Sequence, residues 1–197
     1  NIFEALNNNF FGTLNLVSLC EDFEFENFIL ISSDKAVRPS SIMGATKRLS
    51  ELIVQAYSSK SNSKTVYSIV RFGNVLGSSG SVINKFNQQI ESENFVTVTH
   101  PKVTRFFMTV EESVNLILHA SLMAKGGEIF LLDMGEPVKI IDIAKKMITL
   151  RGLKVRDKMN VGGVEIKIIG LKPGEKLYEE LLIDANAEIS ENPNIFY

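Results

Sequence analysis

The 197-residue sequence has little of what marks several classes of protein. It contains one cysteine, Cys20, so no internal disulfide can form, and a lone thiol favours a reducing compartment. With only two histidines beside it, we expect no metal site. No run approaches the roughly 20 apolar residues of a membrane span and no secretory leader is visible, so we expect a cytoplasmic protein.

The sequence also lacks an excess of charge of either sign. Lys and Arg number 21 and Asp and Glu number 23, which gives a formal net charge of -2. Because positive and negative charges are so evenly balanced, they provide no general attraction to nucleic acid or to an anionic membrane. We therefore expect no nucleic-acid partner and no membrane contact by this segment.

A glycine-rich phosphate loop is missing as well. No G-x-G-x-x-G follows a predicted strand, and Gly77-Ser78-Ser79-Gly80 has too few glycines at the required spacing. The chain starts at Asn1 rather than at a methionine, and it opens inside a helical pattern. We therefore expect a fragment of a longer protein.

What the sequence does contain is an alternation of β and α patterns, with 45% hydrophobic residues to build a core. This order predicts an α/β fold with a mainly parallel sheet covered by helices on both faces. Leu49, Leu52 and Ile53 are expected to face inward from their helix. We expect strands at 28–31 (buried on both faces), 65–72, 95–99, 128–132 and 164–169, and helices at 6–17, 43–57, 82–90, 111–124, 140–150 and 177–182.

Two short segments could carry chemistry. Ser32-Ser33-Asp34-Lys35 directly follows the first predicted strand, and open α/β sheets place ligands at the carboxyl ends of their strands. An adjacent acid and amine can donate and remove protons, although a solvated turn would show the same pattern. Met43 and Lys47 lie four residues apart on one helix face, with small residues between them that allow a flat ligand to approach.

Together with these segments, five ordered blocks resemble a known family: residues 32–47, 71–82, 99–109, 127–137 and 170–181. They look like the extended short-chain dehydrogenase/reductases. Within that family they are most similar to the UDP-N-acetylglucosamine 4,6-dehydratases of the bacterial polysaccharide-biosynthesis group. The resemblance implies the C-terminal part of a Rossmann-like doubly wound parallel sheet, interleaved with a small mixed α/β substrate-binding lobe.

The resemblance also implies a division of the chain. Residues 1–75 and 106–134 would form a partial NAD(P)-binding Rossmann domain that lacks its N-terminal glycine-rich half. Residues 76–105 and 135–197 would form the nucleotide-sugar lobe. For the full-length protein it implies a homo-oligomer, either cytoplasmic or the cytoplasmic domain of an inner-membrane protein.

The resemblance assigns catalytic roles residue by residue. Lys47 matches the lysine of the family's Tyr-x-x-x-Lys pair, but Met43 stands where the tyrosine should be, and a thioether has no proton to transfer. By resemblance, Lys35 removes the proton from sugar C5 and Asp34 protonates the departing C6 hydroxyl. Ser33 would hydrogen-bond the sugar O4.

The remaining assignments concern the cofactor and the substrate. The implied cofactor is a recycled NAD or NADP, contacted by Lys47, Asn9 and Ser32. The implied substrate is a UDP-sugar, with its diphosphate bound by Asn74 and Arg105 and further contacts from Lys172, Ser81, Val82 and Thr97. The plainer readings are a polar helix residue for Asn9, surface charge for Arg105 and Lys172, and a helix N-cap for Ser81.

Two other functions fit the sequence. A UDP-sugar epimerase of the same family is one, although it needs a base for the C4 hydroxyl and Met43 argues against it. The other is a fragment or paralogue that binds nucleotide sugar without turning it over, which the missing glycine-rich loop favours. The adjacent Asp34 and Lys35 favour elimination of water, and we expect a dehydratase.

Overall fold

The structure is a computed structural model that describes residues 1–23, 25–60, 64–78, 80–181 and 187–197. The chain forms two compact units. Unit 1 comprises Asn1–Gly73, Glu111–Asp133 and Glu180–Tyr197, and unit 2 comprises Asn74–Val110 and Met134–Glu179. The chain therefore leaves unit 1 twice and returns to it twice.

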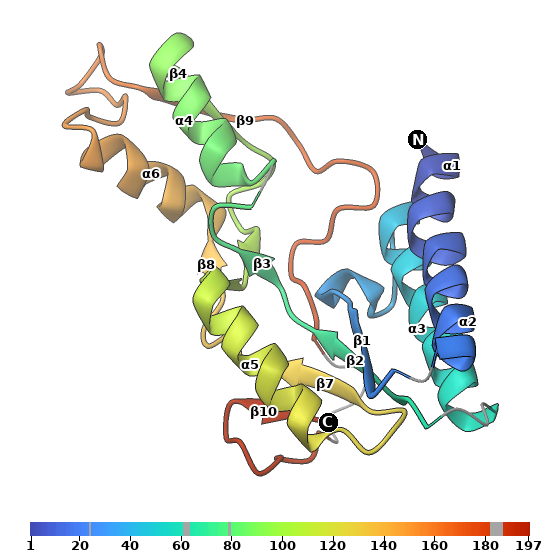
Figure 1. The fold of residues 1–197 in the computed structure, drawn as a ribbon. Helices are drawn as coiled ribbons and strands as arrows, with labels where there is room; N and C mark the ends of the chain where they lie inside the picture. The colour runs from blue at the N-terminus through green and yellow to red at the C-terminus, as the bar shows by residue number, and fades with distance from the viewer. Residues whose placement is uncertain (24, 61–63, 79, 182–186) are drawn as a thin grey trace. The chain divides into compact units, whose positions relative to one another are not determined.

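Unit 1 is built on a four-stranded sheet in the order β1-β2-β7-β10 (Figure 1). The first three strands are parallel, and β10 runs antiparallel beside β7. Ile69 of β2 pairs with Leu30 on one side and Ile129 on the other, and Ile69 is fully buried. The strands are β1 (Asn27–Ile31), β2 (Val66–Arg71), β7 (Ile129–Leu132) and β10 (Ile195–Phe196).

The helices of unit 1 include two long ones, α2 and α3, that lie side by side and away from α5 (Figure 1). A π-helical stretch, Leu6–Phe11, joins the short helix α1 to α2. A single 3-10 turn, η2, follows β1 directly. The bounds are α1 (Ile2–Ala5), α2 (Gly12–Phe23), η2 (Asp34–Ala36), α3 (Ile42–Lys60) and α5 (Val110–Met123).

The buried face of α3 differs from the expected one. Leu49 and Leu52 are 39% and 45% exposed, so the prediction that they face inward was wrong. The buried residues of α3 are mostly small or polar: Gly44, Thr46, Ser50, Glu51 and Val54. Polar groups can occupy a buried face when they are hydrogen-bonded, and the site described below supplies those bonds.

Strand β1 also differs from its prediction. It lies at one edge of the four-stranded sheet, and Ile31 is 40% exposed while Leu30 is buried. The expectation of a strand buried on both faces along its length was therefore wrong. A short apolar run predicts a strand, but it does not show how many neighbours that strand has.

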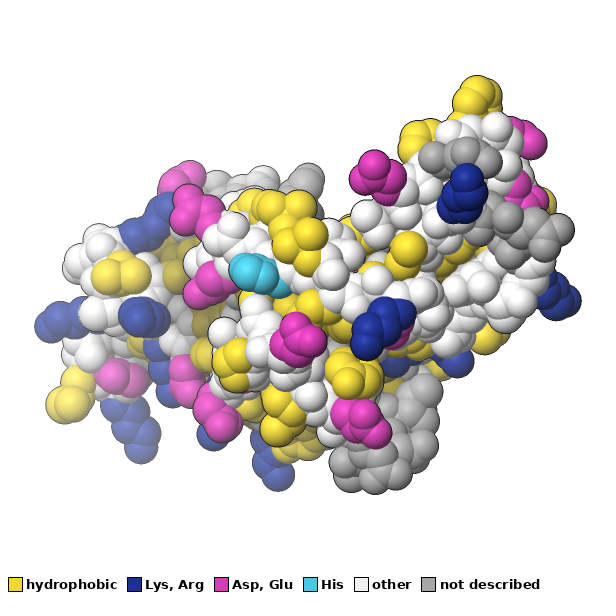
Figure 2. Space-filling model, turned by 60° about the horizontal axis from the view of Figure 1, so that its bottom comes forward, with side chains coloured by type: hydrophobic (Ala, Val, Ile, Leu, Met, Phe, Trp, Pro, Cys, Tyr) yellow, Lys and Arg dark blue, Asp and Glu magenta, His cyan; other side chains and the backbone are white. Residues whose placement is uncertain are grey.

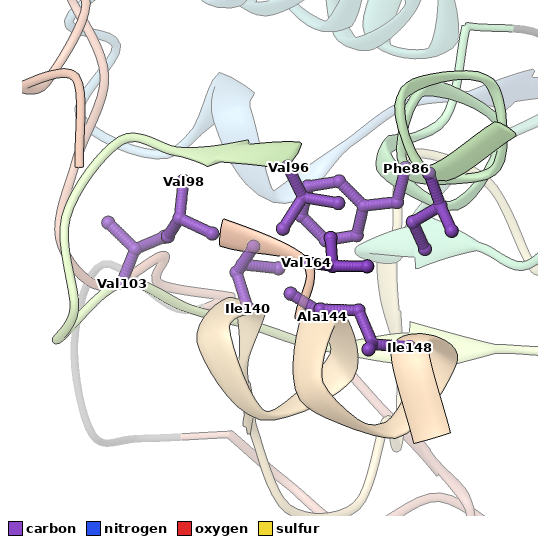
Figure 3. Packing of buried hydrophobic residues seen from close by; sticks show 9 residues of the cluster. Phe86, Val96, Val98, Val103, Ile140, Ala144, Ile148 and Val164 are labelled. Carbon is purple, nitrogen blue, oxygen red and sulfur yellow. The ribbon is translucent and has the colours of Figure 1, made fainter. Parts of the chain in front are cut away.

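Unit 2 has its own apolar core between two helices and a two-stranded parallel sheet (Figure 3). Phe86 from α4, Val96 from β4 and Ile148 from α6 are fully buried there. The elements are α4 (Val82–Ser92), α6 (Ile140–Leu150), β4 (Phe95–Val98) and β9 (Glu165–Ile168). Two further pairs are β3 (Asn74–Val75) with β6 (Phe107–Met108), and β5 (Thr104–Arg105) with β8 (Val138–Lys139).

The C-terminal segment corrects two expectations. Residues 180–197 belong to unit 1 rather than to the second lobe, because β10 pairs with β7 through Ile195 and Leu132. The short helix expected at 177–182 is absent from residues 177–181, and residue 182 lies outside the described residues. The carbonyl of Leu177 accepts the backbone N–H of Thr104 at 3.1 Å, a bond to a distant segment instead of one within a helix.

The surface mixes side-chain types. On the face drawn in Figure 2, hydrophobic side chains lie beside charged ones of both signs. Within the described ranges, no helix combines the length and the apolar character that crossing a membrane requires. The same residues hold no group of three or more His, Cys, Asp or Glu side chains arranged to bind a metal ion.

Candidate functional site

The turn after β1 is fixed to the neighbouring strand by its backbone. Ser32 donates its N–H to the carbonyl of Val70 at 2.8 Å, and Asp34 donates its N–H to the carbonyl of Phe72 at 3.1 Å. Ser33 caps the 3-10 turn, because its Oγ accepts the N–H of Lys35 at 3.3 Å. The side chains of this turn therefore start from defined positions at the carboxyl end of the sheet.

Asp34 and Lys35 form an ion pair within the turn. The distance from Lys35 Nζ to Asp34 Oδ1 is 2.8 Å, and Ser33 Oγ donates to the same oxygen at 2.8 Å. The side chain of Asp34 is fully buried, whereas that of Lys35 is 25% exposed. Asp34 Oδ2 is buried and has no hydrogen-bond partner among the described residues. The turn thus holds an acid and an amine in contact, with one carboxylate oxygen left to bond.

Lys47 reaches the same strand end from α3. Its Nζ donates to the carbonyl of Ile31, the last residue of β1, at 3.1 Å. Burial lowers the pKa of the Lys47 ammonium below its ordinary value, while the negative charge of Glu51 acts in the opposite direction. Met43, one turn earlier on the helix, is 43% exposed. The structure therefore brings Lys47 to the turn and presents no ionisable group at position 43.

Gly44 shows why small residues follow Met43. A Cβ added to Gly44 would lie 2.2 Å from the carbonyl oxygen of Lys35 and 3.2 Å from the Cβ of Pro39. The helix therefore approaches the backbone of the turn after β1 at this point. The sequence interpretation, that small residues here admit a flat ligand, was wrong for Gly44, because the space is filled by the protein's own backbone.

The buried carboxylate of Glu51, which the sequence interpretation missed, joins α3 to the turn after β1 and to β2. Glu51 Oε1 accepts from Ser32 Oγ at 2.6 Å and from Arg71 Nε at 2.7 Å. Its Oε2 accepts from Arg71 Nη2 at 2.6 Å and from Arg48 Nη1 at 2.8 Å. Burial by itself raises the pKa of Glu51, but the hydrogen bonds from Arg71, Ser32 and Arg48 outweigh it and hold the pKa below its usual value.

The structure gives Ser32 a different contact from the expected one. Ser32 is 5% exposed, and its hydroxyl donates to Glu51 rather than pointing outward. Asn9, in the π-helical stretch, donates from Nδ2 to Thr46 Oγ1 at 2.9 Å, and its carbonyl accepts from Ser50 Oγ at 2.6 Å. Two of the three residues expected at the cofactor, Ser32 and Asn9, thus contact other residues of the protein in this structure.

Arg105 is the most enclosed cation of unit 2's expected site. It is 8% exposed, and its Nη1 donates to the carbonyl of Thr104 at 2.7 Å. Two carboxylates face it: Glu175 Oε1 lies 3.3 Å from Nη2, and Glu179 Oε1 lies 3.7 Å from Nε. The reading of Arg105 as ordinary surface charge does not fit this burial.

Glu175 links Arg105 to the turn at Lys172. Glu175 Oε1 also accepts from Thr99 Oγ1 at 2.8 Å, and its Oε2 accepts the backbone N–H of Lys172 at 3.1 Å. The N–H of Glu175 donates to the Lys172 carbonyl at 2.9 Å, which closes a turn between these two residues. Lys172 itself is exposed at this turn.

The remaining expected substrate residues lie elsewhere in unit 2. Asn74 opens β3 and donates its N–H to the carbonyl of Phe106 at 3.1 Å. Ser81 is the N-cap of α4, as its plainer reading held, and Val82 is packed against the apolar core. Thr97 is hydrogen-bonded to Gln89, with its N–H donating to Gln89 Oε1 at 3.0 Å.

The expected site residues therefore fall into two sets. The first set lies at the end of β1 in unit 1 and comprises Ser32, Ser33, Asp34, Lys35 and Lys47. Asn9, also in unit 1, is hydrogen-bonded to α3. The expected substrate residues all belong to unit 2. The residues that the sequence interpretation missed are Glu51, Arg71, Glu175 and Glu179. A glutamate four residues after Lys47, on a helix that must bury one face, was the one signal that could have indicated Glu51.

The chain is similar in sequence to known proteins. The family described as polysaccharide biosynthesis protein matches residues 1–197. The capsular polysaccharide biosynthesis protein CapD of Staphylococcus aureus is 53% identical over 179 residues, which are 91% of this chain and 29% of CapD. A UDP-glucose 4-epimerase of Rickettsia rickettsii is 37% identical over 180 residues, which are 91% of this chain and 50% of that protein. The chain thus spans half or less of these two relatives.

Solved structures match the fold. Pen from Bacillus thuringiensis superposes with a TM-score of 0.81 at 38% identity, covering 91% of this chain and 54% of Pen. DesIV, a dTDP-glucose 4,6-dehydratase from Streptomyces venezuelae solved with NAD, gives a TM-score of 0.76 at 15% identity over 92% of this chain and 61% of DesIV. The predicted α/β class with a Rossmann-type parallel sheet is confirmed. The chain belongs to the polysaccharide biosynthesis protein family of short-chain dehydrogenase/reductases.

Proposed function

We propose that the full-length protein is a UDP-N-acetylglucosamine 4,6-dehydratase, which removes water from the sugar to give a UDP-4-keto-6-deoxy sugar in the making of a bacterial glycan. The single observation that carries this proposal is the contact between Asp34 and Lys35, 2.8 Å apart at the carboxyl end of β1. Elimination across C5 and C6 needs a base for the C5 proton and an acid for the leaving hydroxyl, and these two side chains supply both.

The donors at this strand end fit a nicotinamide cofactor. Lys47 has three N–H donors, and one of them bonds the Ile31 carbonyl at 3.1 Å, so the ammonium can also bond the ribose hydroxyls. When bound, NAD or NADP would accept a hydride from sugar C4 and return it to C6, so that no reductant is consumed. The solved DesIV structure, which contains NAD, supports this choice.

The ion pair must change its protonation before it can act. Moving one proton from Lys35 Nζ to Asp34 Oδ1 along their 2.8 Å hydrogen bond leaves a neutral amine and a neutral carboxylic acid. The amine then takes the C5 proton, and the acid gives its proton to the departing C6 oxygen, so water leaves and both residues return to their starting charges. When the hydride returns to C6, C5 must regain a proton, from Lys35 or from water, to give the saturated 4-keto-6-deoxy sugar.

The neighbouring residues complete the proposed reaction. Asp34 Oδ2, buried without a partner in the described structure, remains to accept a hydrogen bond while Oδ1 carries the transferred proton. Ser33, whose hydroxyl already lies 2.8 Å from Asp34 Oδ1, would hydrogen-bond the sugar O4. With Met43 in place of a tyrosine, the proton of the C4 hydroxyl must pass to the Asp34–Lys35 pair or to water.

We propose that unit 2 recognises the nucleotide part of the substrate. Arg105 and Asn74 would bind the diphosphate with help from Lys172, and a guanidinium suits this role because its paired donors match phosphate oxygens. The carboxylates of Glu175 and Glu179 would have to share or release Arg105 when the diphosphate binds. Ser81, Val82 and Thr97 would form the wall around the uracil.

An epimerase is the second candidate, because one relative carries that name at 37% identity. It would return the hydride to C4 from the opposite face and would leave the C6 hydroxyl in place. The residue at position 43 is the point of difference. An exposed methionine gives no base for the C4 hydroxyl, and this weighs toward the dehydratase.

Product analysis of the full-length protein separates these functions. UDP-N-acetylglucosamine is incubated in deuterium oxide with NAD, and in parallel with NADP, and the products are examined by mass spectrometry and NMR. A dehydratase gives a 4-keto-6-deoxy sugar that has lost one water and carries solvent deuterium at C5. A C4 epimer with its mass unchanged would establish the epimerase instead, and an unchanged substrate would favour a protein that only binds it.

A further inference from the structure

Glu51 is the most highly bonded side chain near the proposed catalytic turn. A carboxylate has about four positions at which it can accept hydrogen bonds. All four are filled here: two by Arg71, one by Arg48 and one by Ser32, at 2.6 to 2.8 Å. The side chain is fully buried. Glu51 therefore has no position left for a substrate or for a transferred proton.

The partners of Glu51 come from three elements that meet at the proposed site. Ser32 begins the catalytic turn after β1, Arg71 is the last residue of β2, and Glu51 and Arg48 belong to α3. The residue after Arg71, Phe72, accepts the N–H of Asp34. The carboxylate of Glu51 thus ties the start of the turn, through Ser32, and the end of β2, through Arg71, to the helix that carries Lys47.

We propose that Glu51 and Arg71 are positioning residues that hold the turn of Asp34 and Lys35 in place, and that Ser32 acts through Glu51 rather than by contacting the cofactor. This proposal rests on the proposed dehydratase function for its kinetic test. Such a role requires a turn that is held by several hydrogen bonds. Proton transfer slows when its donor and acceptor are displaced by about an ångström.

The contact between Ser32 and Glu51 is the part that can be removed most cleanly. Ser32→Ala deletes one hydroxyl and leaves the Arg71–Glu51 and Arg48–Glu51 bonds in place. Ser68→Ala is a matched control. Ser68 lies on β2 opposite Ile29 of β1, is fully buried, and its hydroxyl has no hydrogen-bond partner in the described part of the chain.

The test compares these two variants in the full-length protein by steady-state kinetics, NAD titration and hydrogen exchange. We expect Ser32→Ala to lower kcat about tenfold while KM and the NAD dissociation constant stay within about twofold, because the chemistry is displaced but the ligands still bind. Ser68→Ala should change none of these. Amide exchange in a peptide spanning residues 30–37 should be faster in Ser32→Ala than in the wild type or in Ser68→Ala.

Each other outcome has a definite meaning. Weaker NAD binding by Ser32→Ala at an unchanged kcat would overturn the proposal and make Ser32 a direct cofactor contact. Equal effects of the two variants would overturn it as well, because any buried hydroxyl would then serve. If the wild type does not act on UDP-N-acetylglucosamine, the dehydratase proposal fails. In that case the exchange measurement still decides whether Glu51 holds the turn through Ser32.

Discussion

The two units of this chain hold their buried arginines in different ways. In unit 1, Arg71 meets Glu51 through two bonds of 2.6 and 2.7 Å, and every acceptor position of the carboxylate is filled. In unit 2, Arg105 faces Glu175 and Glu179 at 3.3 and 3.7 Å, and the longer distance is beyond a hydrogen bond. The first arginine is held by two short bonds to one carboxylate, whereas the second meets two carboxylates at longer distances.

This difference matches the two tasks that we propose for the units. Proton transfer gains from groups that are already in place before the substrate arrives, because no reorganisation is then needed in the transition state. A diphosphate brings its own negative charge, so an arginine that binds it must be able to leave its carboxylates. The following predictions test whether unit 1 carries the chemistry and unit 2 the recognition.

The largest effect is expected at Asp34. Asp34→Asn keeps the shape of the side chain but removes the proposed acid, so kcat of the full-length protein should fall by about 10² or more. The measurement is steady-state kinetics, with a thermal unfolding curve to confirm that the variant is folded. A kcat within a few-fold of the wild type would remove Asp34 from the mechanism.

A smaller effect of a different kind is expected at Arg105. Arg105→Ala should raise KM for UDP-N-acetylglucosamine about 30-fold, which corresponds to roughly 2 kcal/mol for a charge-assisted contact, and should lower kcat much less. The diphosphate is remote from the reacting carbons, so its contacts should be alike in the ground state and the transition state. Arg105→Lys should recover part of the loss, since an ammonium lacks the paired donors.

The kinetics of Arg105→Ala can directly contradict the proposed division between chemistry in unit 1 and recognition in unit 2. An unchanged KM with a lost kcat would place Arg105 with the chemistry rather than with recognition.

Gly44 tests how closely α3 must approach the turn. Gly44→Ala would put a Cβ 2.2 Å from the Lys35 carbonyl oxygen, so the backbone must move, at a cost of about 1–3 kcal/mol in the free energy of unfolding. Gly12→Ala, in α2, is the control, because its Cβ would meet its nearest neighbour at an ordinary 3.5 Å. Urea unfolding curves should show Gly44→Ala destabilised and Gly12→Ala neutral or slightly stabilised. Equal unfolding curves for Gly44→Ala and Gly12→Ala would mean that the backbone near Gly44 can move at little cost in free energy.

The smallest effect concerns acid stability. The pKa of Glu51 is lower in the folded protein than its ordinary value of 4.5, so its ionised form stabilises the fold above that value. This stabilisation should be lost as the pH falls from about 4.5 through the lower pKa of the folded state. Melting temperatures measured from pH 7 to pH 3 should therefore fall less steeply in Glu51→Gln than in the wild type. Glu93→Gln, which removes an exposed carboxylate, should keep the wild-type slope.

Much of the fold could be predicted from the sequence because its elements carry regular patterns. The helix predicted at 140–150 matches α6 at both ends, and the strands predicted at 65–72 and 128–132 match β2 and β7 to within one residue at each end. Strand β10 has two residues and no pattern of its own, so its return to unit 1 could not be read from the sequence. A pairing with β7 more than 60 residues away decides its place.

The candidate site, like the fold, could be predicted only where its residues lie close together in the sequence. The turn of Asp34 and Lys35 and the reach of Lys47 to β1 follow from motifs that are local in sequence. The burial of Glu51 depends on Arg71, 20 residues later, and the enclosure of Arg105 depends on Glu175, 70 residues later. A buried charge is stable only with such partners, and a single sequence does not show which distant residues will provide them.

The central claim is that the turn after β1, and not position 43, carries the proton transfers. It is tested most directly by measuring kcat of Met43→Ala and Lys35→Ala side by side in the full-length protein. The account predicts that Met43→Ala stays within about tenfold of the wild type, since an exposed thioether transfers no proton, while Lys35→Ala falls by about 10² or more. If Met43→Ala lost as much activity as Lys35→Ala, or if Lys35→Ala kept the wild-type kcat, the account would be contradicted.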